Sequence, residues 1–459
     1  MRKEFLKESL EMIKKVIARM QQLPKQHALL MLRQSTSNKL RYLLRCMELH
    51  DIVEQVKEID VVFYDAVDFL RGVPSNERTE IETAIMGLPG NMGGLGIYSY
   101  CELRPLARRA SVSASRNELI LRELSSNQLL VELAEMQQHE GIEEEHNVYR
   151  QVGPVPTVED EQRQNVTQKQ LTQVWMETKR ANLWEKMTRE QQTVFSDNKA
   201  SIKVLDIVPK GIYRSLTNAQ IEANLNIFCL RPKHAGVLCL CGKQNSIAHY
   251  EVCNACDNVA RMTSYRHNAI RDIINDKVNK TSVDLKSSKE PMVYGNQPNN
   301  NQSRADLLIS AKGGMPANHE FHGLFDIMTK VASSRHTQME RDRVLAKAAE
   351  DGVNSVEKIR RLEIQAAVQM GYDLKVNKYA AATAAGIKLT PLIITTAGTM
   401  HKVMYKALKK IFPDSIQRRW VLLDIAIFLA RGRGSVYARD LGIMEVAGAA
   451  AEMEADADV

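Results

Sequence analysis

Aromatic residues and cysteines are scarce in this sequence, and both scarcities narrow the possible folds. Phe, Trp and Tyr make up 5% of the 459 residues, whereas there are 20 methionines. This composition favours helices over a β-sandwich. The chain has only seven cysteines, and three of them fall within fifteen residues. In an intracellular protein, clustered cysteines are more often metal ligands than disulfides.

Long apolar runs are also missing. The longest, from Trp420 to Ala430, is interrupted by Asp424 and is well short of the roughly 20 residues that a membrane span needs. Residues 1–20 carry charges every few positions, which predicts an amphipathic helix and not a secretory signal. We therefore expect an intracellular protein with no membrane partner.

The excess of positive charge is small. Lys and Arg number 62 against 55 Asp and Glu, which gives a net charge of +7. This balance permits binding to nucleic acid but does not establish it.

A glycine-dense segment, Leu88–Ile97 ("LPGNMGGLGI"), interrupts the helical periodicity of the first part of the chain. It matches neither GxxxxGK[ST] nor GxGxxG, so we interpret it as a tight structural loop and not as a phosphate cradle. From Gly141 the sequence is polar and contains two prolines, as is typical of a linker. The segment "TQKQLTQVWMETKRANLWEKM" is helical again by its periodicity.

The cysteine cluster has the spacing C-x-C-x7-H-x3-C. Its members are Cys239, Cys241, His249 and Cys253. Thiolates and a neutral imidazole are the ligands that tetrahedral zinc prefers, so the cluster predicts a structural zinc knuckle. Cys256 and Cys229 are rival ligands. Two alternatives remain open at this point: buried cysteines without metal, and a redox pair formed by Cys253 and Cys256.

An apolar stripe follows the cluster, formed by Ile270, Ile273, Ile274 and Val278. It predicts a helix that begins near Asn268, which would put Arg266 and His267 at the helix N-terminus. A helix N-terminus suits a phosphate contact, although a solvated helix start has the same local pattern.

Two short apolar strands each carry a carboxylate. Asp306 stands near the start of "RADLLISA" and Asp326 lies inside "HGLFDIMT", with a Gly-Gly-Met-Pro-Ala connection between them. A buried carboxylate is costly unless it is paired or metal-bound. A hairpin would bring Asp306 and Asp326 to neighbouring positions, where two hard oxygen ligands suit magnesium. A helix with Lys375, Lys378 and Tyr379 then precedes another buried strand, "LTPLIIT".

The order of these motifs resembles the C-terminal part of non-LTR retrotransposon reverse transcriptase proteins that carry a restriction-enzyme-like endonuclease. "LRYLLRCMEL" and "LPGNMGGLGI" are similar to their thumb-like region, and "ASIKVLDIVPKGIYRSLTNAQIEANLNIFCLRP" to the connector before their zinc knuckle. "CLCGKQNSIAHYEVC" matches the knuckle and "RHN" the motif after it. "EP", "RADLLI", "FDI" and "KVNKY" match the nuclease motifs in order, and the resemblance covers most of residues 40–435.

This resemblance implies a role for each site residue. Zinc would be held by Cys239, Cys241, His249 and Cys253. Asp306 and Asp326 would hold catalytic magnesium, with Lys375 as the catalytic lysine and Tyr379 beside it. Arg266 and His267 would contact the DNA backbone, and Glu290 is an extra candidate for the metal cluster.

The chain departs from the family pattern at three points. The usual (D/E)xK lysine would stand at position 328, which is Met328, so a lysine from the following helix is required; Lys330 and Lys378 compete with Lys375. Ala305 replaces the proline of the PD dipeptide. No Asp-Asp dipeptide of a polymerase palm occurs anywhere, so the resemblance begins after the polymerase.

The fold that we expect is mixed α and β, with a mainly helical N-terminal half, a small zinc knuckle and an α/β restriction-endonuclease-like PD-(D/E)xK core. The expected parts are a helical thumb-like region (1–136), a linker and helix (137–200), a connector and zinc knuckle (201–272), an endonuclease domain (273–435) and a flexible acidic tail (436–459). The expected function is a nuclear, metal-dependent DNA endonuclease that nicks target DNA for primed reverse transcription, with DNA as partner and RNA as a further candidate. The alternative is a catalytically inactive nucleic-acid-binding remnant with a structural zinc knuckle.

Overall fold

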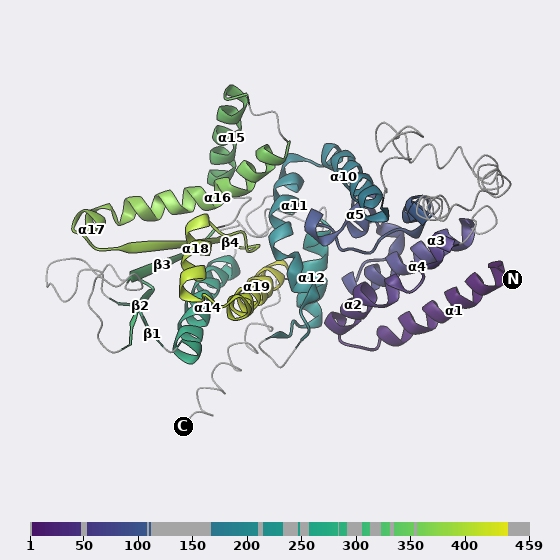
Figure 1. Ribbon diagram of the computed structural model, residues 1–459, viewed down its shortest axis with the longest axis horizontal. Coiled ribbons are helices and arrows are strands. Elements are labelled where there is room, and N and C mark those ends of the chain that lie inside the picture. Colours follow the sequence, from purple (N-terminus) through teal and green to yellow (C-terminus); the bar gives the residue numbers. More distant parts are fainter. Residues whose placement is uncertain are drawn as a thin grey trace, which may run out of the picture. The chain divides into compact units, whose positions relative to one another are not determined.

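The protein is mixed α and β, mostly helical, and contains a small four-stranded sheet (Figure 1). A computed structural model describes residues 2–46, 53–107, 110–111, 167–209, 214–232, 247, 257–282, 284–291, 305–312, 323–330, 335–352 and 356–438. The chain divides into two compact units, Met1–Met187 and Thr188–Val459.

The described part of the first unit is helical. Its helices are α1 (Arg2–Met20), α2 (Lys25–Gln34), α3 (Leu43–Cys46), α4 (Val53–Arg71), α5 (Glu80–Gly87) and α10 (Gln168–Lys186), with short 3₁₀ turns at Thr36–Asn38, Ser75–Glu77 and Gly90–Met92. The predicted amphipathic helix is confirmed as α1: Leu6, Leu10, Ile13 and Ile17 are buried at helical spacing. The helix predicted after the linker is confirmed as α10.

The glycine-dense segment is a tight structural loop, as predicted. Gly93 and Gly96 have φ angles of 95° and 76°, the left-handed region that favours glycine. A Cβ on Gly94 would lie 2.2 Å from the carbonyl oxygen of Leu88. The amide of Gly96 donates to the oxygen of Leu88, and that of Ile97 to Met86. These amides therefore serve the fold of the loop and not a phosphate.

A buried ion cluster joins α4 to the start of α5. The Arg71 guanidinium lies 3.2 Å from an oxygen of Asp68 and 2.7 Å from one of Glu82, and Arg78 lies 2.8 Å from the other oxygen of Asp68. Glu82 also completes a capping box with Thr79. Burial raises the pKa of Asp68 to about 6 in spite of both cations.

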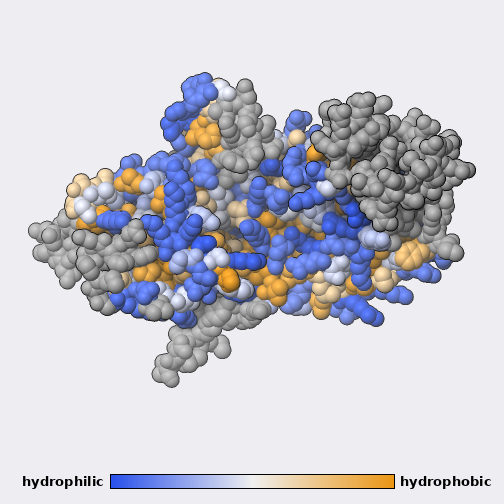
Figure 2. Space-filling model, viewed as in Figure 1, coloured by the Kyte–Doolittle hydropathy of each residue, from blue (hydrophilic) through white to orange (hydrophobic). Residues whose placement is uncertain are grey.

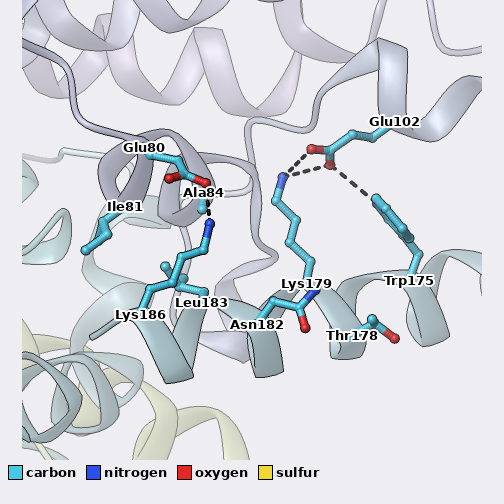
Figure 3. Close-up of a pocket in the computed structure, with 10 residues that line it drawn as sticks. All are labelled: Glu80, Ile81, Ala84, Glu102, Trp175, Thr178, Lys179, Asn182, Leu183 and Lys186. Atoms are coloured by element: carbon cyan, nitrogen blue, oxygen red, sulfur yellow. Dashed lines mark hydrogen bonds and ion pairs between the residues drawn. The ribbon is translucent and has the colours of Figure 1, made fainter. Parts of the chain in front are cut away.

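A pocket of about 210 Å³ lies between α5 and α10 (Figure 3). Lys179 donates to both carboxylate oxygens of Glu102, at 2.6 and 2.7 Å, and Lys186 pairs with Glu80. Gly87 leaves room for the Lys179 ammonium, which a Cβ there would approach to 3.0 Å. Both pocket lysines thus have carboxylate partners, and the pairs connect α10 to the rest of this unit.

The second unit is built from helices around a four-stranded sheet. Its helices are α11 (Arg189–Ser201), α12 (Asn218–Phe228), α14 (Asp257–Thr281), α15 (Arg335–Glu350), α16 (Val356–Lys378), α17 (Ala380–Ala384), α18 (Lys402–Ile411) and α19 (Ser415–Ala438), with a 3₁₀ turn at Ile202–Asp206. Its strands are β1 (Leu285–Lys289), β2 (Leu307–Ala311), β3 (Gly323–Lys330) and β4 (Leu389–Thr395).

The strands lie in the order β1-β2-β3-β4. β1, β2 and β3 pair antiparallel in turn, whereas β3 and β4 pair parallel, with Asp326 opposite Pro391. The predicted hairpin of β2 and β3 and the predicted strand β4 are confirmed. β1 was not predicted from the sequence. Only Leu285 of this strand is buried, so pairing with β2 defines it and an apolar pattern does not.

The two faces of the sheet have different neighbours (Figure 1). Phe325 and Ile327 of β3 pack in one apolar core with residues of α14, α18 and α19. The alternate residues of a strand point to the opposite face. α16 covers that face, since a Cβ on its Gly371 would lie 2.8 Å from Ile393 of β4 and 3.2 Å from Lys330.

The surface that Figure 2 displays is mostly hydrophilic, with small separate apolar patches. No helix within the described ranges is long and apolar enough to span a bilayer. The predicted apolar run from Trp420 to Ala430 lies inside α19, where Asp424 pairs with Arg214 at 2.9 Å.

Candidate active site

Asp306 and Asp326 stand opposite each other at the β2–β3 pairing. Leu307 pairs with Phe325, so continuing the antiparallel register by one residue brings Asp306 opposite Asp326. The Asp306 amide donates to the Phe325 carbonyl at 2.9 Å, which extends the ladder to that position. The hairpin therefore brings the two carboxylates to neighbouring positions, as the sequence predicted.

The Asp306 carboxylate is held on both oxygens. His267 Nε2 lies 3.0 Å from Oδ1, and the Ile327 amide donates to Oδ2. Burial opposes ionisation of this group, but the hydrogen bonds from His267, Asp326 and Ile327 outweigh it and lower the pKa of Asp306. Asp306 is thus fixed in orientation and kept as an anion.

Asp326 is the more deeply buried of the two, with 3% of its surface exposed. Burial is the largest cause that raises its pKa, and a hydrogen bond shared with Asp306 raises it further, against the opposing effect of Lys375. Two facing carboxyls in little water repel each other when both are ionised. A cation between them would relieve that repulsion.

Of the three lysines that the sequence left open, the structure brings Lys375 to Asp326. Its Nζ lies 2.6 Å from Asp326 Oδ2, and the side chain is mostly buried. Lys378 instead donates to the Tyr379 hydroxyl at 2.9 Å. Lys330 lies along Gly371, and burial, with the nearby charge of Lys375, lowers the pKa of its ammonium.

Gly371 is the residue that lets Lys375 reach the sheet. It lies one helical turn before Lys375 on the same face of α16. Because a Cβ there would meet Ile393 at 2.8 Å, the missing side chain allows α16 to approach β3 and β4 closely. The 2.6 Å contact between Lys375 and Asp326 depends on that approach.

The predicted helix start near Asn268 is wrong. α14 begins at Asp257, so Arg266 and His267 lie inside the helix and not at its N-terminus. Arg266 is 2% exposed and packs against Gly432 of α19, where a Cβ would come within 2.7 Å of its Nε. This burial removes the reason for assigning Arg266 a contact with the DNA backbone.

His267 turns toward Asp306 instead, a role that the sequence reading missed. The signal was present, because His267 stands three residues before Ile270 and continues the stripe of Ile270, Ile274 and Val278, which are fully buried against the sheet core. Extending that stripe by one turn would have placed His267 on the sheet side of α14.

Tyr379 and Glu290, which were predicted to take part in the catalytic centre, contact other residues. Tyr379 is 2% exposed and packs in a small core with Ala305 and Ala382, which supports a packing role beside Asp306; its predicted part in the chemistry stays a prediction. The Glu290 amide donates to the Asp306 carbonyl at 3.0 Å, and its carboxylate pairs with Arg271 at 2.5 Å. Glu290 thus supports Asp306 through its backbone.

The predicted zinc ligands lie outside the described residues. These are Cys239, Cys241, His249 and Cys253, and the rival ligand Cys256 lies there too. The other rival, Cys229, is buried at the end of α12. In the described ranges, His, Cys, Asp and Glu side chains form no group of three or more that could hold a metal ion. The zinc knuckle therefore stays a prediction.

Neither a scan against models of known protein families nor a search of curated proteins finds a match for this chain.

Proposed function

We propose that the second unit is a metal-dependent DNA endonuclease whose centre consists of Asp306, Asp326 and Lys375. One observation carries the proposal: adjacent strands present two facing carboxyls, and a lysine from the next helix lies 2.6 Å from one of them. Phosphodiester hydrolysis needs a cation for the phosphate charge, an activated water and a positive group near the developing charge.

Magnesium suits this donor set. It prefers oxygen ligands and is commonly held by one or two carboxylates together with substrate phosphates, so a third protein ligand is not required. Asp306 and Asp326 would hold the ion. When bound, magnesium neutralises phosphate charge and makes its water ligand a better nucleophile.

The remaining residues prepare the site for substrate. His267 and the Ile327 amide keep Asp306 ionised and oriented. Lys375, held next to Asp326, would orient the attacking water and stabilise the charge that develops on the phosphate. It would thereby replace the usual (D/E)xK lysine, whose position is occupied by Met328.

The order of the sequence motifs extends the proposal to a biological setting. The chain would be the C-terminal part of a non-LTR retrotransposon protein and would nick target DNA to prime reverse transcription. The alternative is a nucleic-acid-binding remnant that no longer cuts. Conversion of supercoiled plasmid to the nicked form, in Mg²⁺ or Mn²⁺, separates the two.

The test uses Asp306→Asn, Asp326→Asn, Lys375→Met and Lys330→Met. We expect each Asp variant to lose nicking on the order of 10³-fold, because the metal loses a ligand. Lys375→Met should lose about 10²- to 10³-fold, as expected for one lost electrostatic group. Lys330→Met should lose less, because Lys330 lies along Gly371 and Lys375 is the lysine that contacts Asp326.

Asp373→Asn is the matched control, since Asp373 is an exposed carboxylate on the same helix. It should cut and bind DNA like the wild type. Nicking retained in Asp306→Asn and Asp326→Asn would reject the proposed centre. A wild-type chain that binds DNA but never nicks it in either metal would favour the remnant.

A further inference from the structure

The outward face of α18 is a stripe of positive charge. Lys402, Tyr405, Lys406, Lys409 and Lys410 are all exposed, and their spacing of three and four residues puts them on one side of the helix. We call these five residues the α18 basic stripe. Tyr405 lies among the lysines, and 49% of its surface is exposed.

The opposite face of α18 is fully used in packing. Met404, Leu408 and Ile411 are buried in the core that covers the sheet. Packing therefore explains the apolar half of the helix. On the basic half, Lys409 and Lys410 lie in the last turn, where cations favour the helix dipole, but Lys402 and Lys406 do not.

The lysines of the stripe also lack local compensation. Ion pairs and hydrogen bonds within the described ranges include none to Lys402, Lys406, Lys409 or Lys410. The first turn of α18 contains no acidic residue, and Lys402 is its first residue. Cations at a helix N-terminus oppose the helix dipole. Four adjacent lysines also repel one another, and a polyanion would relieve this repulsion.

α18 is fixed to the helix that carries Lys375. His401, which caps α18, lies 3.0 Å from the Gln369 side chain of α16 and stacks on Tyr372 with ring centroids 4.4 Å apart. Tyr372 stands three residues before Lys375. The stripe and the proposed catalytic centre thus belong to the same unit, with α18 packed on the face of the sheet opposite to α16.

We propose that the α18 basic stripe binds the backbone of double-stranded DNA; this inference rests on the proposed nuclease function and names the surface that holds its substrate. From Lys402 to Lys410 the helix rises about 12 Å. Duplex DNA presents one phosphate charge per about 1.7 Å of its axis, so several phosphates face a stripe of this length. The Tyr405 hydroxyl can donate to a phosphate or sugar oxygen.

Charge and burial favour DNA over an anionic membrane. A helix that lies in a membrane interface inserts its apolar face between the lipids. The apolar face of α18 is already buried in the sheet core. What remains exposed is lysine and one tyrosine, which matches a phosphate backbone.

The test replaces the four stripe lysines together with glutamine. The control replaces four exposed lysines on other elements of the same unit, namely Lys203, Lys280, Lys286 and Lys347. Both variants lose the same charge. Binding to a labelled 30-base-pair duplex is measured by fluorescence anisotropy over a series of salt concentrations.

We expect the stripe variant to bind at least about tenfold more weakly at low salt, and its salt slope to fall by about three to four, since each lost phosphate contact removes close to one unit. The control should stay within about twofold of the wild type. Equal losses in both variants would mean that total charge, and not the stripe, sets affinity, and would overturn the proposal. So would unchanged DNA affinity with lost binding to phosphatidylserine vesicles, or a loss confined to single-stranded RNA of equal length.

Folding and nicking are measured as well, so that a loss of DNA binding is not confused with misfolding or with loss of catalysis. Circular dichroism checks the fold, and Lys406→Gln with Lys409→Gln serves if the fourfold variant is misfolded. The control variant, with Lys203, Lys280, Lys286 and Lys347 replaced, should nick like the wild type, whereas Asp326→Asn should bind DNA but not cut it. Stripe-dependent binding by a wild type that never nicks would reject the nuclease and retain the DNA surface.

Discussion

At the scale of single residues, burial decides which side chains hold protons. Asp68 in the first unit illustrates this, because its carboxylate keeps a pKa of about 6 although Arg71 and Arg78 both contact it. Desolvation of the buried carboxylate outweighs the attraction of the two guanidinium groups. The buried cluster therefore links proton binding to the stability of this unit.

We predict that Asp68 makes the first unit less stable as pH rises from about 4 to about 6. The folded-state pKa of about 6 exceeds the ordinary 3.8, so the folded chain binds more protons between these values. The stabilising contribution is fully present below about pH 4 and is lost as pH rises through 6. Hydrogen exchange of the α4 amides reports the local free energy of opening.

Asp68→Asn should flatten this dependence, because asparagine does not titrate. The exposed Asp276→Asn in the second unit is the control and should leave the α4 profile as in the wild type. An α4 stability that rises between pH 4 and pH 6 relative to Asp68→Asn would contradict the assignment.

At this scale, the sequence predicted side-chain neighbours correctly where strand pairing brings them together. Asp306 and Asp326 could be placed together because two apolar strands that follow each other in the sequence predict a hairpin that pairs them. Arg266 could not, because its burial depends on Gly432, which is 166 residues away in the chain. Lys375 was identifiable as a candidate, but its choice over Lys330 and Lys378 required the packing of α16 on the sheet.

At the scale of elements, the close approach of α16 to the sheet sets the geometry of the centre. We predict that Gly371→Ala reduces nicking while leaving DNA affinity unchanged. The added Cβ would lie 2.8 Å from buried Ile393, so α16 must shift and carry Lys375 away from Asp326. Overpacking of this kind costs about 1–3 kcal/mol, partly offset by the helix preference of alanine, about 1 kcal/mol.

The nicking rate at saturating DNA and the melting temperature measure this effect. Asn377→Ala, on the exposed side of α16, gives a gain in helix preference without a new contact and should cut normally. A Gly371→Ala protein with the wild-type nicking rate would show that the close approach is not needed.

The elements that the sequence predicted well are those with an apolar pattern of their own. α1 and α10 bury residues at helical spacing, and β3 and β4 are short apolar runs, of which β4 buries five residues in succession. β1 has a single buried residue and exists through its pairing with β2, a long-range effect that a local pattern does not contain. The start of α14 was missed because the nine residues before Arg266 carry no strong apolar stripe.

At the scale of the whole molecule, we predict one zinc ion per chain. Cys239, Cys241, His249 and Cys253 have ligand chemistry and spacing suited to zinc. Elemental analysis of freshly purified protein should give a zinc-to-protein ratio near one. Cys239→Ser should lose the metal, because only three ligands remain.

Cys256→Ser is the control and should keep the zinc. Loss of metal from Cys256→Ser with retention in Cys239→Ser would reassign the ligands. A purified wild-type protein without zinc would favour the alternatives of unligated or redox-active cysteines.

The long-range contacts of α19 affect how the second unit folds during synthesis. Its Arg433 donates to Asn198 of α11 at 2.8 Å, and its Ala430 carbonyl accepts from Asn224 of α12 at 2.9 Å, so partners more than 200 residues apart complete the same packing. A ribosome releases α11 and α12 long before α19. Until α19 is synthesised, the apolar surfaces of α11 and α12 that it will cover stay exposed. Chaperones can bind these surfaces, and a stalled nascent chain would aggregate through them.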